Sequence, residues 1–286
     1  MKAIVPFLVV ALLIVLVATT SVKKANENNY YKKLIPPGTA QLSPNFYCDK
    51  TEVTNANWRE YMQWAAHIFG ASSKEYAATL PDTTIWKQKG LATYTTHYFT
   101  HPAFNEYPIV GVSQAQAIAF SKWRADRVFE SILVKYGKIK WNVTSQNSSN
   151  YFTIERYLSG AFMNYVPDPN FNYYPVYTLP TTQQQSAIVH YTDSINIRYT
   201  KQSSQTLPMS YASIKPALQL ANVDAIKAKK NPIHHINTNV AEWLMEPNEC
   251  ASGNIENVTT TNITTQTTPN YYTGFRNVCE WKLWVK

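Results

Sequence analysis

The stretch FYCDKTEVTN, residues 46–55, decides the fold that the rest of the chain must follow. Its first half alternates and is rich in aromatic and β-branched residues, which is typical of a strand. Helical periodicity starts directly after it, with Thr54 or Asn55 as the residue that caps the first turn. The stretch therefore predicts a corner at which a strand passes straight into a helix.

The helix predicted after this corner lies in the sequence TNANWREYMQWAAHIFG, residues 54–70. Its apolar residues recur at helical spacing and would form one buried stripe. The stripe consists of Trp58, Tyr61, Met62, Ala65 and Phe69. Gly70 follows the stripe and is the expected end of the helix.

A second corner is expected at Ser113. Residues 109–112 are predicted as a short buried strand, and Ser113 with Gln116 has the spacing of a capping box. The expected buried face of the helix that follows consists of Ala115, Ile118, Ala119 and Trp123. Thr181 and Gln184 repeat the capping-box spacing and predict the start of a third helix.

Two segments show no clean periodicity. Residues 128–177, rich in Tyr, Asn and Pro, are predicted as an irregular insertion. Residues 252–273, rich in Thr and Asn, are predicted as a surface loop or an exposed hairpin.

The distribution of charge argues against nucleic acid as a partner. The 286 residues carry a formal net charge of +8. Residues 1–33 hold five lysines against one glutamate, a net of +4, so half of the excess lies in this tail. The remaining chain shows no stripe of Lys and Arg of the kind that follows phosphates. We therefore expect no nucleic-acid partner.

An apolar run follows Lys2 and extends over residues 3–22. This is the pattern of an export signal, and about 20 residues at 1.5 Å each are also enough to cross the ~30 Å core of a bilayer. Residues 1–22 are therefore predicted as a signal peptide or an uncleaved N-terminal membrane anchor, with a polar linker over residues 23–33. In both cases the rest of the chain is expected to be exported, to the periplasm or the cell surface.

The sequence contains an odd number of cysteines: Cys48, Cys250 and Cys279. In an oxidising compartment this count predicts one disulfide and one free thiol. A lone thiol can be a nucleophile or a metal ligand, but a buried and inert cysteine is the commoner case.

Taken in order, six segments resemble the formylglycine-generating, sulfatase-modifying enzyme family. They are IPPGTAQL (35–42), FYCDKTEVTN (46–55), YPIVGVSQAQAIAFSKW (107–123), LPT (179–181), TNVAEW (238–243) and GFR (274–276). The resemblance covers residues 34–286 and implies one domain with a variant of the C-type-lectin fold. This is an α+β fold with short strands, few helices and much irregular structure.

The resemblance also implies that the corner at Thr54 belongs to the framework of the fold and not to a catalytic centre. The signature residues of the framework are Glu52, Thr54, Asn55, Trp123, Trp243, Gly274, Phe275 and Arg276. A carboxylate and two caps would hold the corner in place.

The departures from the family pattern concern its chemistry. Formylglycine-generating enzymes carry a reactive cysteine pair before the GFR segment, where two thiolates bind copper(I) and activate oxygen. This chain has only Cys250 in that stretch. The acidic family segment after Leu-Pro is TTQQQS here, and the family's tryptophan after Val-Ser is Gln114. No catalytic and no cofactor-binding residue is therefore predicted.

The resemblance suggests two metals to consider. One branch of the family uses iron held by histidines, but the adjacent His234 and His235 would point in different directions on a strand. Family members also hold structural calcium through an Asn-Val-x-Glu segment, which makes Asn239, Val240 and Glu242 candidate ligands. In the alternative interpretation Glu242 only accepts hydrogen bonds from main-chain amides.

A disulfide is implied as well. In the family the first and last strands lie close together, so Cys48 and Cys279 are the expected pair, with Cys250 and Cys279 as the second choice.

These features together favour a degenerate family member, similar to the gliding-motility lipoproteins that serve structurally in bacterial envelopes. The expected function is that of an exported, non-catalytic binding or scaffold module. Its partner would be an envelope protein or a surface glycan, contacted by the aromatic and Asn-rich loops at 136–177 and 252–273, and the N-terminal segment would contact the membrane. The alternative is a metal-dependent oxidoreductase of the formylglycine-generating type, which modifies a protein or a small thiol.

Overall fold

The computed structural model describes residues 34–87, 91–141, 143–202, 231–251, 253 and 263–285. The predicted signal or anchor at residues 1–22 and the linker at residues 23–33 lie outside the described residues. Within the described ranges, none of the helices combines the length and the hydropathy that a bilayer crossing needs.

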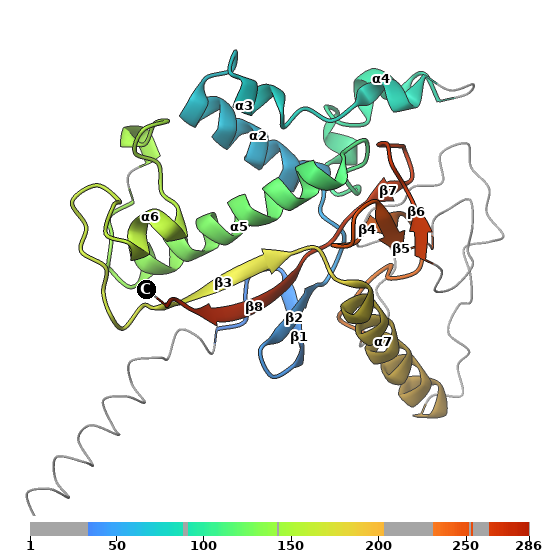
Figure 1. Cartoon of the computed structure of the whole chain (residues 1–286). Coiled ribbons are helices and arrows are strands. Elements are labelled where there is room, and N and C mark those ends of the chain that lie inside the picture. Colours follow the sequence, from blue (N-terminus) through green and yellow to red (C-terminus); the bar gives the residue numbers. More distant parts are fainter. Residues whose placement is uncertain are drawn as a thin grey trace, which may run out of the picture.

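Short strands and a few helices alternate along the chain, and the architecture is α+β as predicted (Figure 1). The strands are β1 (Thr39–Ser43), β2 (Phe46–Asp49), β3 (Tyr173–Thr178), β4 (Ala241–Trp243), β5 (Glu249–Ala251), β6 (Ile263–Thr265), β7 (Thr273–Gly274) and β8 (Val278–Leu283). The α-helices are α2 (Asn55–Phe69), α3 (Lys74–Ala77), α4 (Tyr94–His97), α5 (Gln114–Lys135), α6 (Ile154–Leu158) and α7 (Thr182–Gln202). Short 3₁₀ helices are η2 (Thr83–Trp86), η3 (Pro102–Phe104) and η4 (Val143–Ser145).

The described strands form two separate sheets. The first sheet has the order β1-β2-β8-β3, and all its neighbouring strands are antiparallel. The second sheet has the order β6-β5-β4-β7, in which only β4 and β7 are parallel. Strand β8 thus lies between strands that are far from it in sequence. Helix α5 lies alongside β3 (Figure 1).

Helix α2 begins and ends where the sequence predicts. Thr54 is its N-cap and forms a capping box with Asn57, because the Thr54 side chain accepts from the Asn57 N–H while the Asn57 side chain accepts from the Thr54 N–H. Gly70 ends the helix with a φ of 91°, which favours glycine. The strand-to-helix corner at residues 46–55 is therefore confirmed.

Helix α5 begins at the predicted capping box of Ser113 and Gln116, but it buries a different face. Ala115, Ile118 and Ala119 are exposed, whereas Ala117, Phe120 and Ser121 are buried. The reason is tertiary contact: Phe120 stacks on Trp58 of α2, and Ser121 accepts a hydrogen bond from Asn277 at 2.7 Å. The helix is thus rotated about its axis relative to the sequence-based prediction.

Residues 109–112 are buried as predicted, but they do not form a strand. Ile109 donates to the carbonyl of Val53 at 2.8 Å, and an isolated bridge joins Thr54 to Pro108. The ladder stops there because Gly111 adopts a φ of 75°, which turns the backbone out of the extended conformation.

The segment 128–177 is only partly irregular. It contains the end of α5, helix α6 and nearly all of β3. Its aromatic residues supply much of the largest buried cluster, with Phe129, Phe152, Tyr157, Phe162, Phe171 and Tyr177. These side chains form the core between α5 and the first sheet, so Phe152, Tyr157, Phe162, Phe171 and Tyr177, which were predicted to belong to a contact surface, are interior residues.

Candidate functional site

Two parts of the structure gather polar and charged side chains: a buried network behind the corner at Thr54, and a surface pocket beside β3. In the buried network, Asn55 at the start of α2 donates from its side chain to the carbonyls of Tyr98 at 3.1 Å and Phe104 at 3.0 Å. Asn55 therefore holds the corner against a loop that is far away in sequence.

Glu52 precedes the corner and is 1% exposed. Its Oε1 accepts a hydrogen bond from the Asn239 side chain at 3.0 Å, while Oε2 has no hydrogen-bond partner among the described residues. Burial raises the pKa of Glu52 to about 8, and the neighbouring carboxylate of Glu242 adds to this effect although Arg276 opposes it. Glu52 therefore holds a proton at neutral pH.

Arg276 and Glu242 form an ion pair in the centre of this network. The Arg276 Nε donates to the two oxygens of Glu242 at 2.8 Å and 2.7 Å, and Nη2 donates to Oε1 at 2.5 Å. The same Nη2 also donates to the carbonyl of His234 at 2.9 Å. The Arg276 guanidinium is fully enclosed, and burial by itself would lower its pKa. The negative charge of Glu242 outweighs burial, so the pKa of Arg276 is raised.

A second ion pair ties α5 to the first sheet. Arg124 donates to both oxygens of Asp49, at 2.6 Å and 2.8 Å, and its guanidinium lies over the ring of Tyr177 at 4.3 Å from the ring centre. Asp49 also accepts from the main-chain N–H of Asn277 at 2.9 Å. The carboxylate therefore joins β2, α5 and the segment before β8.

The three candidate calcium ligands lie in one buried segment, but their side chains face in different directions. Asn239 donates to Glu52, Val240 packs in a cluster with Trp86 and Tyr98, and both oxygens of Glu242 face Arg276. Across the described ranges no group of three His, Cys, Asp or Glu side chains could hold a metal ion. Calcium at these residues remains a prediction, and it would compete with Arg276 for the Glu242 carboxylate.

The predicted disulfides are not formed. Cys48 lies opposite Val278 and Cys279 lies opposite Tyr47, so Cys48 and Cys279 occupy adjacent positions in the ladder and their side chains leave opposite faces of the sheet. Cys250 lies in the second sheet, where its sulfur contacts the Thr264 hydroxyl at 3.1 Å. All three thiols are free and buried, and each belongs to a different hydrophobic cluster.

Two departures from the family pattern have structural roles that the sequence did not reveal. Gln114 donates to the carbonyls of Leu244 at 2.6 Å and Glu246 at 2.7 Å, which joins the start of α5 to the loop after β4. The Glu246 carboxylate in turn accepts from the main-chain N–H of Thr182 at 3.0 Å, so it stabilises the N-terminus of α7. Glu246, which lies in another segment, thus takes the place of the family's acidic residues that are missing after Leu179-Pro180.

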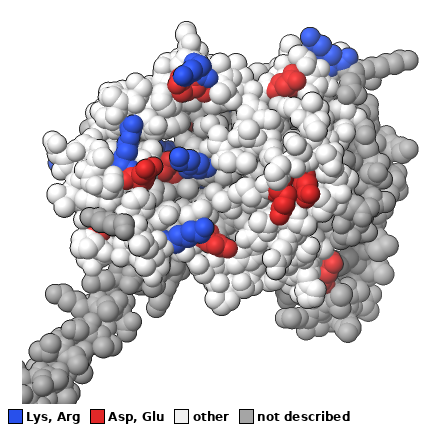
Figure 2. Space-filling view, viewed as in Figure 1, with Lys and Arg blue, Asp and Glu red and all other residues white. Residues whose placement is uncertain are grey.

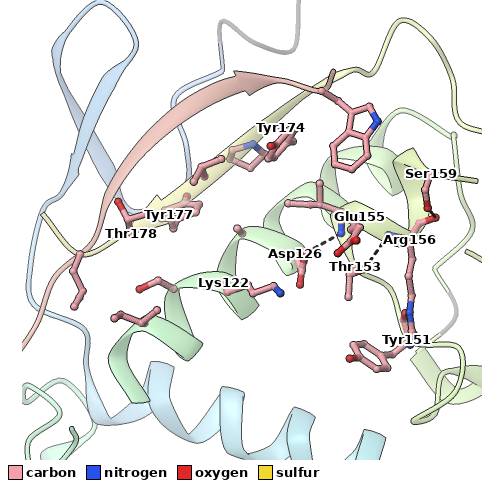
Figure 3. Close-up of a pocket in the computed structure, with 18 of the residues that line it drawn as sticks. Lys122, Asp126, Tyr151, Thr153, Glu155, Arg156, Ser159, Tyr174, Tyr177 and Thr178 are labelled. Carbon is pink, nitrogen blue, oxygen red and sulfur yellow. Dashed lines mark hydrogen bonds between the residues drawn. The ribbon is translucent and has the colours of Figure 1, made fainter. Parts of the chain in front are cut away.

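The surface pocket has a volume of about 660 Å³ and lies between β3 and the helices α5 and α6 (Figure 3). Its wall on α5 consists of Ile118, Ser121, Lys122, Ala125 and Asp126, and its wall on β3 consists of Tyr174, Pro175, Val176, Tyr177 and Thr178. Tyr151, residues 153–156, Ser159, Ala161, Leu179, Met245 and Trp284 complete the lining.

The pocket is apolar with a few charged groups. Asp126 accepts a hydrogen bond from the Ile154 N–H at 2.8 Å, and burial raises the pKa of its carboxyl to about 6 although Lys122 and Arg127 oppose this. Lys122 and Asp126 point from α5 into the same space, while Arg156 turns away to stack on Tyr151 (Figure 3). The side chains of Ile118 and Met245 are exposed there.

A model of a known protein family matches most of the chain. The family model of the sulfatase-modifying factor enzyme 1-like domain matches residues 13–249, which is most of the chain. The chain belongs to this family.

A solved structure is also similar to this sulfatase-modifying factor domain. A crystal structure of CarF aligns at 14% sequence identity and a TM-score of 0.43, over 82% of this chain and 86% of that chain. No curated protein matches significantly. The α+β architecture is the C-type-lectin-like fold of the family, as predicted.

All signature residues of the sulfatase-modifying factor domain lie within or against the buried network and its adjoining core. Trp243 donates from its indole to the Val112 carbonyl at 2.9 Å, and Phe275 packs edge-on against Trp58. Gly274 pairs with Glu242, where a side chain would meet the Ile109 carbonyl at 2.8 Å. Trp123 is half-buried against Phe120 and Tyr61.

The copper centre of the family's enzymes does not fit the cysteines of this sulfatase-modifying factor domain. Such a centre needs two neighbouring thiolates, because soft thiolate ligands select copper(I). Here burial raises the pKa of Cys48, Cys250 and Cys279, which keeps each thiol protonated. The three sulfurs also belong to different clusters.

The sequence did not indicate the pocket. Its lining comes from several separate segments, and the sequence alone placed Ile118 on the packing face of α5. Small residues at Ser121 and Ala125 were the available signal, since they let β3 approach the helix closely. On the face shown in Figure 2, basic and acidic side chains lie beside one another among uncharged residues.

Proposed function

We propose that this sulfatase-modifying factor domain is an exported, non-catalytic binding or scaffold module of the cell envelope. The observation that carries the proposal is the placement of its cysteines. The family's oxygen chemistry needs a pair of thiolates, and each of the three thiols here is enclosed in its own hydrophobic cluster. All three lie in the described part of the chain.

The buried charges give further support. Glu242 is neutralised by Arg276 and Asp49 by Arg124. The side chains of Glu242, Arg276 and Asp49 are at most 5% exposed, and that of Arg124 is 18% exposed. Charges that are paired with each other inside the core stabilise the arrangement of segments, but they are not available to a substrate. The surface pocket beside β3 is a largely apolar hollow of the kind in which ligands bind.

Thiol reactivity and metal content test this proposal together. The full-length chain is treated with a thiol reagent in its native state and in concentrated guanidinium, and bound metals are measured by mass spectrometry. We expect almost no reaction of the native protein, reaction of all three cysteines after unfolding, and no stoichiometric copper or iron. A Cys250→Ser variant, with two cysteines left, is the control for counting.

The opposite result would favour the alternative function. Two thiols that react rapidly in the native protein, together with nearly one copper per chain, would indicate a metal-dependent oxidoreductase that modifies a protein or a small thiol. Calcium alone would agree with a structural ion at Asn239 and Glu242 and would leave the binding role intact.

Export is tested separately, because it depends on residues 1–33. These residues are fused to a reporter enzyme that folds only in an oxidising compartment, and the fusion is expressed in a bacterium. We expect reporter activity, and we expect its loss when Leu13 and Leu16 are both changed to Arg, since charges interrupt the apolar run. Activity that is unchanged by these substitutions would contradict the proposal.

A further inference from the structure

The most exposed apolar side chains of the domain gather at one end. Among the described residues, the large hydrophobic side chains with the highest exposed fractions are Val166 at 86%, Val285 at 78%, Trp141 at 64% and Ile35 at 58%. Single exposed apolar residues are normal on a protein surface, whereas a group of them marks an interaction site. The contacts of the neighbouring residues show that these four belong together.

Trp141 and Val166 lie on two loops that touch each other. The main-chain N–H of Lys140 donates to the hydroxyl of Tyr165 at 3.0 Å. Each of these residues directly precedes one of the two exposed side chains. The loops after α5 and after α6 therefore present Trp141 and Val166 from the same end of the domain.

The two ends of the described chain lie there as well. The main-chain N–H of Trp284, next to Val285, donates to the Asn172 carbonyl at 2.7 Å. Leu34, next to Ile35, packs against the same hydrophobic cluster as Trp284. This is the end at which Figure 1 marks the C-terminus. It is called the basal end here, and it consists of residues 34–35, 135–141, 162–173 and 282–285.

The basal end is basic and aromatic. It contains four lysines and one aspartate, a net charge of +3, and Lys138 pairs with Asp168 at 2.7 Å. The other lysines are exposed: Lys135, Lys140 and Lys282. Half-buried aromatic side chains lie among them: Tyr136, Tyr165, Tyr173 and Trp284. Tryptophan and tyrosine are enriched where lipid head groups meet acyl chains, and lysines attract anionic head groups.

The chain outside the described residues joins the domain at this end. Residues 1–22 are the predicted anchor, and residues 23–33 are the predicted linker. The eleven residues of the linker reach about 36–40 Å when fully extended and about 17–20 Å as a flexible coil. A domain of this size is roughly 45 Å across. A linker this short makes the basal end the part of the domain that lies nearest to the bilayer.

We infer that the basal end docks on a surface of anionic phospholipids. Trp141 and Val166 insert among the lipid head groups, and the exposed lysines contact their phosphates. The N-terminal segment thus holds the domain at the membrane, and the basal end fixes its orientation. The second sheet, at the other end of the domain, then faces away from the bilayer (Figure 1). The inference rests on the proposed export and on the uncleaved form of the anchor.

The first experiment measures how close single side chains come to lipid. The full-length chain with Val166→Cys is labelled with a fluorophore and incorporated into lipid nanodiscs that contain phosphatidylglycerol. Lipids with bromine atoms just below the head group are the quencher, since bromine quenches only on contact. We expect the brominated lipids to lower the fluorescence at least about twofold.

Leu80→Cys with the same fluorophore is the matched control. Leu80 is 45% exposed and follows α3, which lies away from the basal end (Figure 1). Its fluorescence should fall by less than about 1.2-fold. The unsubstituted chain gives the background, because its three cysteines are buried. Equal quenching at the two positions would overturn the inference. A fluorophore at position 166 that is shielded from water but not quenched would indicate a protein or a second copy on this surface, which would overturn it too.

The second experiment tests the role of charge. Lys135→Gln and Lys140→Gln are combined in the labelled Val166→Cys chain, and the docking equilibrium is obtained from the quenched and unquenched fractions. Each lysine near an anionic surface strengthens binding roughly fivefold, so the pair should weaken docking about tenfold or more. Nanodiscs of neutral lipid should weaken it in the same way.

Lys74→Gln with Lys87→Gln removes the same charge from exposed positions outside the basal end. This pair should change docking less than about twofold, and circular dichroism shows whether all variants fold. Equal effects of the two pairs, or equal docking on neutral and anionic discs, would contradict an anionic lipid surface as the ligand.

Failure of the anchor and failure of docking give different results. Elution of the unsubstituted chain together with the nanodiscs reports on the N-terminal segment, and the reporter fusion reports on export. Neither measurement depends on the basal end. A chain that elutes apart from the discs would overturn the inference together with the anchor. Elution with the discs but without quenching at position 166 would overturn the docking alone.

Discussion

Arg276 illustrates how single residues hold this domain together. Its guanidinium is fully enclosed, and Glu242 is the carboxylate that neutralises it. Removal of one member of a buried ion pair leaves an uncompensated charge, which costs about 3–5 kcal/mol. We therefore expect Arg276→Met to lower the free energy of unfolding by about that amount in urea titrations followed by tryptophan fluorescence.

A matched control comes from a more exposed pair. Lys138 lies 2.7 Å from Asp168, and the two side chains are 33% and 21% exposed. Lys138→Met should cost only about 0–1 kcal/mol because solvent screens this pair. Equal costs for the two substitutions would mean that the Arg276 pair is not enclosed as described.

Glu52 predicts a dependence of stability on pH. Its pKa is about 8 in the folded protein and 4.5 for a free side chain, so between these pH values the folded state retains a proton that the unfolded chain releases. Its contribution to stability is complete below about pH 4.5 and is lost as the pH rises to about 8. The pKa of Asp126 is raised in the same direction, but only to about 6.

The measurement is the free energy of unfolding at several pH values from about 6 to about 8, for the wild type and for Glu52→Gln. The wild type should lose stability over this range, and Glu52→Gln should lose clearly less, since glutamine does not titrate. Parallel curves for the two proteins would show that Glu52 ionises at its ordinary pKa.

At the scale of residues, the sequence identified the members of the buried network but not their partners. Glu242 and Arg276 stood in two separate family segments, 34 residues apart, and nothing local indicates that they form a pair. The same limit produced the wrong disulfide. Proximity of two strands does not tell whether two cysteines share a face, because a shift of one residue reverses the side-chain direction.

At the scale of elements, the backbone conformation of Gly111 lets the segment before α5 pass close to the segment around Asp82. It adopts a φ of 75°, and a Cβ atom there would lie 2.6 Å from the Asp82 carbonyl oxygen. We expect Gly111→Ala to lower the free energy of unfolding by at least about 2 kcal/mol, since backbone strain of about 1–2 kcal/mol adds to the clash. Thermal or urea unfolding measures this effect.

Gly137→Ala separates strain from clash. Gly137 has a similar φ of 66°, but no heavy atom lies within 4 Å of the position of its Cβ. This substitution should cost only the strain, about 1–2 kcal/mol. If Gly111→Ala were no more costly than Gly137→Ala, the close approach to Asp82 would be refuted.

The start of α5 provides a second prediction at this scale. The Ser113 hydroxyl accepts from the Gln116 N–H at 3.2 Å as part of the capping box. Ser113→Ala should lower the free energy of unfolding by about 1 kcal/mol. Ser131→Ala, at an exposed position of the same helix, should change it by less than about 0.5 kcal/mol.

The elements that the sequence predicted correctly are those fixed by local chemistry. The N-cap at Thr54, the capping box at Ser113 and the glycine at 70 act within a few residues, so their positions could be inferred. The face of α5 and the content of residues 128–177 could not. Ile118 and Phe120 are both apolar, and only the contact with Trp58 decides which of them is buried.

At the scale of the whole molecule, β8 joins parts of the chain that are far apart. It pairs with β2 on one side and β3 on the other, and its buried side chains Cys279 and Trp281 belong to the largest hydrophobic cluster. We expect removal of residues 278–286 to abolish the cooperative unfolding transition in calorimetry. Removal of residues 285–286 alone should leave it nearly unchanged, because Val285 is 78% exposed.

The position of β8 also has a consequence for how the protein is made. Both strands that flank β8 are synthesised long before it, so the first sheet has a gap at its centre until the ribosome has passed residue 283. Contacts between such distant segments form slowly, because a long loop must close first. Until β8 has been made, β2 and β3 lack the strand that lies between them, so the core of the first sheet cannot be completed while residues 179–277 are being added.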